Sequence, residues 1–280
     1  MTTRTLMIAV VIGLAAIAIA AGATLTGVFA LQGGVARTAG YLEPSQLVSS
    51  QNGWKLDFWM TPKNSTVPIR AYDLDMTKLL HVIIVSDDFT KFIHVHPRLF
   101  PNGHFVLDQA LPGPGIYHVY SDGRPAGIGQ QVFRFDLRSG TTGGATLRDL
   151  GERNSAMLVD GYSVTLSTLS LRAGSMARIA IHIAKNGKPA TDIHPYLGAL
   201  AHAVFLDADD LTYVHVHPVT LGAMMMETAS TTVYSNDKAI VSPNMLLYVT
   251  VNEKGTYKLW FQFRGGASLH VASFVLSAES

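Results

Sequence analysis

Beyond residue 50 the chain is built of short, largely apolar segments separated by turns of glycine, proline and asparagine. The segments are rich in β-branched and aromatic residues, and most are five to seven residues long, as in residues 54–59, 80–85, 92–96, 116–120 and 131–137. This pattern is typical of antiparallel strands. No long segment in this region has the 3.6-residue period of an amphipathic helix. The pattern therefore predicts an all-β protein.

A different pattern opens the chain. Residues 6–31 are uncharged and largely apolar, they follow Arg4, and the next charge is Arg37. The stretch provides the roughly 20 apolar residues that a membrane-spanning helix needs. It exceeds the apolar core of a cleavable signal peptide, about 7 to 15 residues. We expect a transmembrane anchor, with cleavage near residues 21–23 as the alternative, and an exported remainder in both cases.

One phrase occurs twice in the sequence. The first copy reads His81-(x12)-His94-Val95-His96-Pro97, and the second reads His202-(x12)-His215-Val216-His217-Pro218. Most residues between the first two histidines differ between the copies. A second match follows each phrase, since Gly-Ile-Tyr at residues 115–117 recurs as Gly-Thr-Tyr at 255–257. These matches indicate an internal duplication of a whole domain in which the histidines were kept.

A flexible segment separates the copies. Residues 139–144 are rich in glycine and threonine, and residues 148–153 are rich in charge, which is typical of a linker. The sequence predicts an N-terminal anchor or signal segment over 1–40, a first domain over 41–138, a linker over 139–155 and a second domain over 156–280. Residues 41–52 are expected to form a linker with a possible short helix. Short, regularly spaced strands favour two tandem immunoglobulin-like or cupredoxin-like β-sandwiches.

The spacing of the histidines predicts that they meet. If Ser86 pairs with Lys91 in a hairpin, His81 lies opposite His96, and His94 lies diagonally from His81 on the same face. The same arithmetic applies to the second copy. Opposed Cβ atoms are about 4.5 to 5.5 Å apart, so the imidazoles can reach one ion with bonds of about 2.0 to 2.1 Å. A slip of one residue would send the first histidine to the other face.

A fourth histidine is a candidate ligand in the second copy. Alternation along the last strand places His270 on one face with Ala272, Phe274 and Leu276, whereas the first copy has Gln131 at the matching position. The predicted metal ligands are His81, His94, His96, His202, His215, His217 and His270. The alternative is that these side chains are half-buried histidines that bond the backbone and fix a turn.

The amino-acid composition limits which partners and metal ligands the chain can have. A net charge of +1 and 15% charged residues leave no basic stripe for nucleic acid. The absence of cysteine excludes thiolate ligands. Neutral imidazoles suit copper, zinc, nickel or iron, and we take a copper or zinc ion as the expected partner. The methionines at 224–226 are candidate thioether ligands for Cu(I), although such residues also serve as flexible packing.

The two phrases, each followed by a Gly-x-Tyr strand, resemble a family of uncharacterised secreted or membrane-anchored bacterial proteins. This resemblance covers most of residues 50–280 and includes residues 196–199, which lead into the second phrase. It implies an envelope location and a β-rich fold, with distant similarity to periplasmic copper-handling sandwiches. With the N-terminal apolar segment, we expect a single-pass protein of the bacterial inner membrane with its domains in the periplasm or outside the cell, or a protein secreted after signal cleavage. The family implies no established activity.

The leading functional hypothesis is an envelope metal-binding protein, not an enzyme, that buffers or delivers copper or zinc. One alternative is a metalloenzyme, because three histidines leave one position open for a bound water. A second alternative is an interaction module that binds another envelope protein through structural histidine-bearing sheets. The duplicated ligand set and the lack of a recognisable nucleophile motif favour the first hypothesis.

Overall fold

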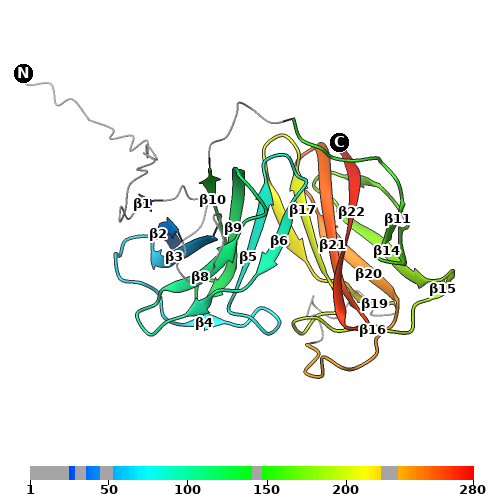
Figure 1. Cartoon of the computed structure of the whole chain (residues 1–280), viewed down its shortest axis with the longest axis horizontal. Helices are drawn as coiled ribbons and strands as arrows, with labels where there is room; N and C mark the ends of the chain where they lie inside the picture. The colour runs from blue at the N-terminus through cyan, green and yellow to red at the C-terminus, as the bar shows by residue number, and fades with distance from the viewer. Residues whose placement is uncertain (1–24, 29–35, 45–52, 141–146, 222–232) are drawn as a thin grey trace, which may run out of the picture. The chain divides into compact units, whose positions relative to one another are not determined.

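The computed structural model describes residues 25–28, 36–44, 53–140, 147–221 and 233–280, and all regular secondary structure in these ranges is strand (Figure 1). The all-β prediction is confirmed. The chain divides into two compact units. The first comprises residues 1–73, 79–84 and 93–142, and the second comprises residues 74–78, 85–92 and 143–280. Each unit is described separately.

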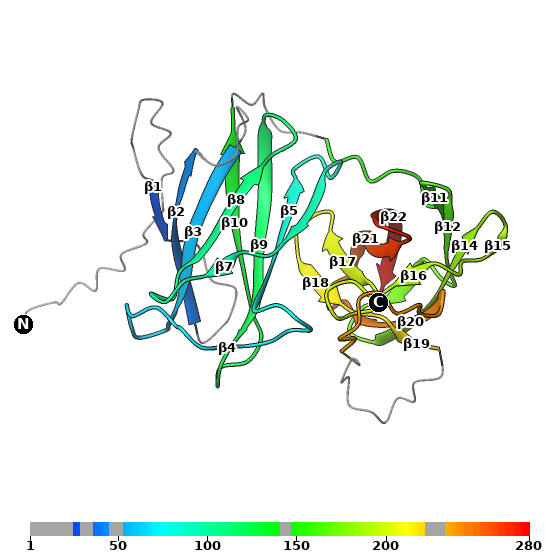
Figure 2. The ribbon, with the colours of Figure 1, turned by 60° about the horizontal axis from the view of Figure 1, so that its bottom comes forward.

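Among the described residues, two sheets of five strands each belong mainly to the first unit, and residues 85–92, at the tip of one hairpin, fall in the second. One sheet has the order β1-β2-β3-β8-β7 (Figure 2), and the other has the order β10-β9-β5-β6 with β4 paired to β9. The strands are β1 (Leu25–Val28), β2 (Ala36–Pro44), β3 (Gly53–Pro62), β4 (Tyr72–Asp73), β5 (Leu80–Ser86), β6 (Phe92–Val95), β7 (Arg98–Leu99), β8 (Phe105–Ala110), β9 (Gly115–Pro125) and β10 (Gln131–Ser139). Both sheets contribute to one core, with Phe58 and Phe105 from one and Val82, Val119 and Phe133 from the other.

Within the described ranges, the second unit contains two sheets of six strands each. Their orders are β11-β12-β14-β20-β19, with β15 on β14, and β13-β22-β21-β17-β18, with β16 on β21. The strands are β11 (Ala156–Val159), β12 (Tyr162–Leu166), β13 (Ser170–Arg172), β14 (Met176–Lys185), β15 (Lys188–Pro189), β16 (Ile193–His194), β17 (His202–Asp207), β18 (Tyr213–Val216), β19 (Val219–Thr220), β20 (Asn244–Thr250), β21 (Gly255–Gly265) and β22 (Ser268–Glu279). Ile179 and Leu247 from one sheet and Phe205, Phe261 and Phe274 from the other belong to one core.

The duplication seen in the sequence extends to strand order. Within the first unit β10, β9, β5 and β6 are neighbours in that order, and within the second β22, β21, β17 and β18 follow the same order. A tight turn lies six residues before the first histidine of each phrase, with reciprocal backbone hydrogen bonds between its ends. Its second residue, Met76 or Leu197, has a left-handed φ of 54° in both copies. The repeat therefore preserves the hairpin together with the turn that leads into it.

The structure corrects the sequence-based reading of residues 36–44. This segment, expected to be the end of the anchor and a linker with a short helix, is strand β2, and each of its residues pairs with β3. The backbone of β3 offers a full row of hydrogen-bonding groups, which β2 satisfies. Residues 25–28, expected at the end of a membrane helix, form strand β1 paired with β2. The rest of the predicted anchor lies outside the described residues.

Within the described ranges, no helix is long and apolar enough to cross a membrane.

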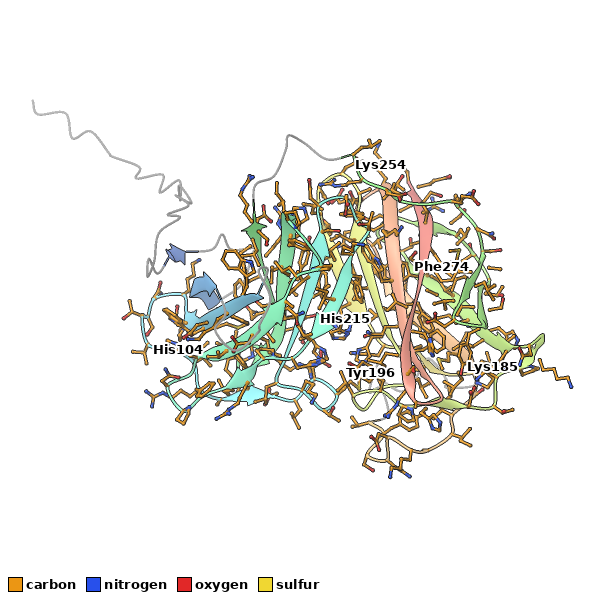
Figure 3. All side chains as sticks on the ribbon, in the orientation of Figure 1. His104, Lys185, Tyr196, His215, Lys254 and Phe274 are labelled. Carbon is orange, nitrogen blue, oxygen red and sulfur yellow. The ribbon has the colours of Figure 1, made fainter. Side chains whose placement is uncertain are left out.

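The shared core of the second unit should dominate its stability. Phe274 is fully buried on β22 and carries a label in Figure 3. Replacing Phe274 by Ala should lower the free energy of unfolding by about 3 to 5 kcal/mol, because the cavity cannot collapse fully. Urea denaturation of the full chain measures this loss. Leu158→Ala, at a position 77% exposed, should change stability by less than about 0.5 kcal/mol, and an equal loss in both variants would contradict the assignment of the core.

Candidate metal centres

Antiparallel pairing of β17 with β18 sets the position of the second histidine phrase. Ala203 pairs with Val216 and Val204 with His215, and the Asp207 amide donates to the Thr212 carbonyl at 2.9 Å near the hairpin tip. Continuing this ladder by one residue places His202 opposite His217. This is the register that the sequence predicts, and β17 is buried along its whole length.

Three imidazoles converge in the second unit. The Nδ1 atom of His202 lies 3.2 Å from Nε2 of His215 and 3.0 Å from Nε2 of His217. The His202 and His215 rings are stacked with centroids 5.5 Å apart, whereas the His217 ring is nearly perpendicular to that of His202 at 4.7 Å. His215 is labelled on this sheet in Figure 3. The Nε2 atoms of two histidines on one hairpin strand and its extension therefore both approach the Nδ1 atom of His202.

The turn before β17 orients the first of these rings. His202 is almost fully buried, and its Nε2 lies 3.1 Å from the backbone carbonyl oxygen of Tyr196. A carbonyl only accepts hydrogen bonds, so Nε2 carries the proton and Nδ1 keeps its lone pair. Metal-ligating histidines characteristically donate their second ring nitrogen in this way. The Tyr196 carbonyl thus fixes both the tautomer and the direction of the Nδ1 lone pair.

The first histidine phrase repeats the arrangement with the same ring nitrogens. Its hairpin register is set by the Ser86 amide, which donates to the Lys91 carbonyl at 3.1 Å, as the sequence predicts. The Nδ1 atom of His81 lies 3.0 Å from Nε2 of His94 and 3.1 Å from Nε2 of His96. The same nitrogen of each histidine therefore faces inward in both copies.

The approach of two ring nitrogens to one Nδ1 atom suits a shared ion better than a single hydrogen bond. Ligand nitrogens about 2.0 to 2.1 Å from a zinc ion are roughly 3.3 to 3.4 Å apart at tetrahedral angles, close to the 3.0 to 3.2 Å seen in the two clusters. Each Nδ1 has either one proton or one lone pair, yet two other nitrogens approach it. Within each unit, the first two histidines of the phrase have ligand atoms within 4.8 Å of each other, a spacing that a shared metal ion requires.

His270 is not part of the second cluster, which corrects the prediction of a fourth ligand. Its Nδ1 lies 2.8 Å from an Asp160 carboxylate oxygen and its Nε2 3.2 Å from the Gly265 carbonyl oxygen. The ladder explains the separation. His270 lies on the core-facing side of its sheet, as Ala272 does, whereas His202 lies on the opposite side, next in sequence to the core residue Ala203. Both nitrogens of His270 face oxygen acceptors, so the ring acts as a hydrogen-bond donor.

Other histidines have partners away from the two clusters. The His104 ring stacks on Trp59 with centroids 4.2 Å apart and contacts Asp57 at 2.8 Å. His182 contacts the Asn244 side chain, and His118 is buried beside Asp136. The methionines at 224–226 lie outside the described residues. Sequence reasoning missed two partners that orient rings, Asp160 and the Tyr196 carbonyl. The second is a backbone group that residue type does not reveal.

Comparison with known proteins gives one family match. The sequence pattern of a family described as a domain of unknown function (DUF8832) matches residues 157–280. This match contains the second histidine phrase, while the first phrase lies outside it. A search of curated proteins gives no match.

The ion pair between His118 and Asp136 predicts a dependence of stability on pH. Burial raises the pKa of Asp136, but the hydrogen bond and charge of His118, with the charges of Arg134 and Arg138, outweigh this effect and lower the pKa. The pair therefore stabilises the fold above the ordinary aspartate pKa of about 3.9, and this contribution is lost as the pH falls through the lowered value.

Asp136→Asn should remove this dependence. The Asp136 side chain is 52% exposed, so solvent screening limits the loss at pH 6 to about 0.5 to 1 kcal/mol. The difference between parent and variant should narrow at acidic pH, as measured by urea unfolding at pH 6 and pH 3. A difference that stays constant between the two pH values would contradict the assigned role of Asp136.

Proposed function

We propose that this chain is a metal-binding protein that holds copper or zinc through its two histidine triads, His81, His94 and His96, and His202, His215 and His217. One observation carries the proposal: in both copies Nδ1 of the first histidine and Nε2 of the other two face one point. Packing alone would not require the same three residues and the same ring nitrogens twice, since apolar or other polar residues fit such positions.

The donor set favours borderline metals. Neutral imidazole is a good ligand for zinc and copper, whereas magnesium and calcium prefer oxygen. The chain has no cysteine to supply thiolate. Three histidines leave a fourth position open on each tetrahedral ion, through which an ion can be passed to another protein. Retention of the same triad in both copies fits storage or delivery better than catalysis, since one active site suffices for an enzyme.

We further propose that the protein is exported and anchored in the cell envelope, where it buffers or delivers these ions. The long apolar N-terminal segment and the resemblance to envelope proteins support this location. We interpret each two-sheet unit as an immunoglobulin-like or cupredoxin-like sandwich. The contribution of both sheets of a unit to one core supports this interpretation.

Metal content of the purified full chain tests the proposal. The parent, made without an affinity tag, should contain copper or zinc by elemental analysis and should gain thermal stability when the ion is added, because the ion binds only the folded state. The double variant with His94→Ala and His215→Ala should lose the metal and the gain while remaining folded. His182→Ala is the matched control and should retain both. A parent protein that binds neither copper nor zinc, or a double variant that keeps its metal, would contradict the proposal.

His270→Ala separates a structural histidine from a ligand. The variant should bind as much metal as the parent, because the His270 nitrogens contact Asp160 and Gly265 and not the triad. It should be less stable by about 1 to 3 kcal/mol, since a buried hydrogen-bonded group is lost. Elemental analysis and urea unfolding give the two quantities. Loss of metal with unchanged stability would restore His270 as a ligand.

A further inference from the structure

A buried lysine in the second unit has no carboxylate partner among the residues that the structure describes. Lys258, on β21, is only 7% exposed. Its Nζ donates to the Leu150 carbonyl at 2.6 Å and lies 3.3 Å from the Asp149 carbonyl. An ammonium group has three hydrogens to donate, so two backbone oxygens leave one hydrogen for another acceptor. Among the described residues, no carboxylate lies within ion-pair distance of this Nζ.

Comparison of the two copies shows that the second lacks a carboxylate that the first has. In the first unit the matching residue is His118, which pairs across the ladder with Asp136 and contacts its carboxylate at 2.8 Å. In the second unit the ladder partner of Lys258 is Val275. A buried charge is costly unless it is paired. The second copy thus has the cation Lys258 where the first has His118. It has the apolar side chain of Val275 where the first has the Asp136 carboxylate.

Lys258 lines a cleft of about 400 Å³, which we call the Lys258 cleft. Its other lining residues include Thr90, Phe92, Asp149, Trp260 and Ser273, all of the second unit. The Trp260 ring stacks on Phe92 with centroids 5.3 Å apart, which makes one wall aromatic. The volume lies within the range of about 300 to 1,000 Å³ found for small-molecule sites.

A glycine with a left-handed backbone conformation lies beside the ammonium group. Gly151 has a φ of 75°, a conformation that favours glycine, and a Cβ there would stand 3.6 Å from the Lys258 Nζ. The Gly151 amide donates to the Asp149 side chain at 2.9 Å, which holds that carboxylate on its own turn. Burial lowers the pKa of Lys258, and the negative charge of Asp149 partly opposes this effect.

We propose that the Lys258 cleft binds a small organic monocarboxylate, whose carboxylate pairs with Lys258 and whose apolar part lies against Trp260 and Phe92. Thr90 and Ser273 also line the cleft, and their hydroxyls can donate hydrogen bonds. A single ammonium matches one negative charge. The nearby Asp149 carboxylate opposes a second charge, so a phosphate dianion is disfavoured.

Benzoate is a suitable probe, since it combines one carboxylate with one flat apolar ring. Titration calorimetry on the full chain, supported by Trp260 fluorescence, should show saturable binding of benzoate. Benzamide, which has the same shape without the charge, and inorganic phosphate should each bind at least about tenfold weaker, the ratio expected for about 1.4 kcal/mol. Absence of benzoate binding, equal binding of benzamide, or preferential binding of phosphate would overturn the proposal.

Lys258→Met tests the role of the ammonium group and should weaken benzoate binding at least about tenfold. The variant should fold, because a similarly shaped apolar residue in place of a buried charge is often neutral or stabilising, and urea unfolding checks this. Lys254→Met is the matched control, at an exposed lysine just before β21 that Figure 3 labels, and should bind benzoate like the parent. Unchanged affinity for benzoate in Lys258→Met would contradict the proposal.

The double variant lacking His94 and His215 should also bind benzoate normally, which keeps this test separate from that of metal binding.

Discussion

The antiparallel pairing of one short hairpin in each copy of the histidine phrase positions the side chains of the candidate metal centres. Because side chains on a strand alternate between faces, only one register brings the first and third histidines of the phrase opposite each other with the second beside them. The Ser86 to Lys91 and Asp207 to Thr212 hydrogen bonds at the hairpin tips hold this register. The hairpin in turn depends on the core, since the alternate residues of β5 and β17 are buried between sheets.

The same alternation separates two kinds of chemistry in the second unit. On one face of its histidine-bearing sheet, residues such as Ala203 and Phe261 belong to the core. His270 lies on the same face and hydrogen-bonds Asp160. On the other face lie the histidine triad and, on the neighbouring strand, Lys258 and Trp260. The sheet thus keeps a rigid apolar side for stability and presents its metal-binding and charged groups on the opposite side.

Much of the candidate site could be predicted from the sequence because it is local. Both hairpins span few residues, so a count from the tip gives the register and the convergence of three histidines. His270 could not be placed in this way. Alternation along β22 shows which residues share a face with His270. It does not show whether His202 on β17 lies on that face, because this depends on the β17-β21-β22 ladder. Strand β2 was missed because its Gly40 and Pro44 interrupt any alternation, and its pairing with β3 is made by backbone atoms. The Lys258 cleft joins segments too distant in sequence for any count to connect them.

The central claim is that imidazole nitrogens of the two triads form the ligand shell of a metal ion. X-ray absorption spectroscopy of the metal-loaded full chain tests it most directly, because it reports the donor atoms and their distances. The account predicts a first shell dominated by imidazole nitrogen at about 2.0 to 2.1 Å for zinc, which disappears in the variant lacking His94 and His215. A shell made of oxygen or thioether sulfur alone, or an imidazole shell that survives those substitutions, would contradict it.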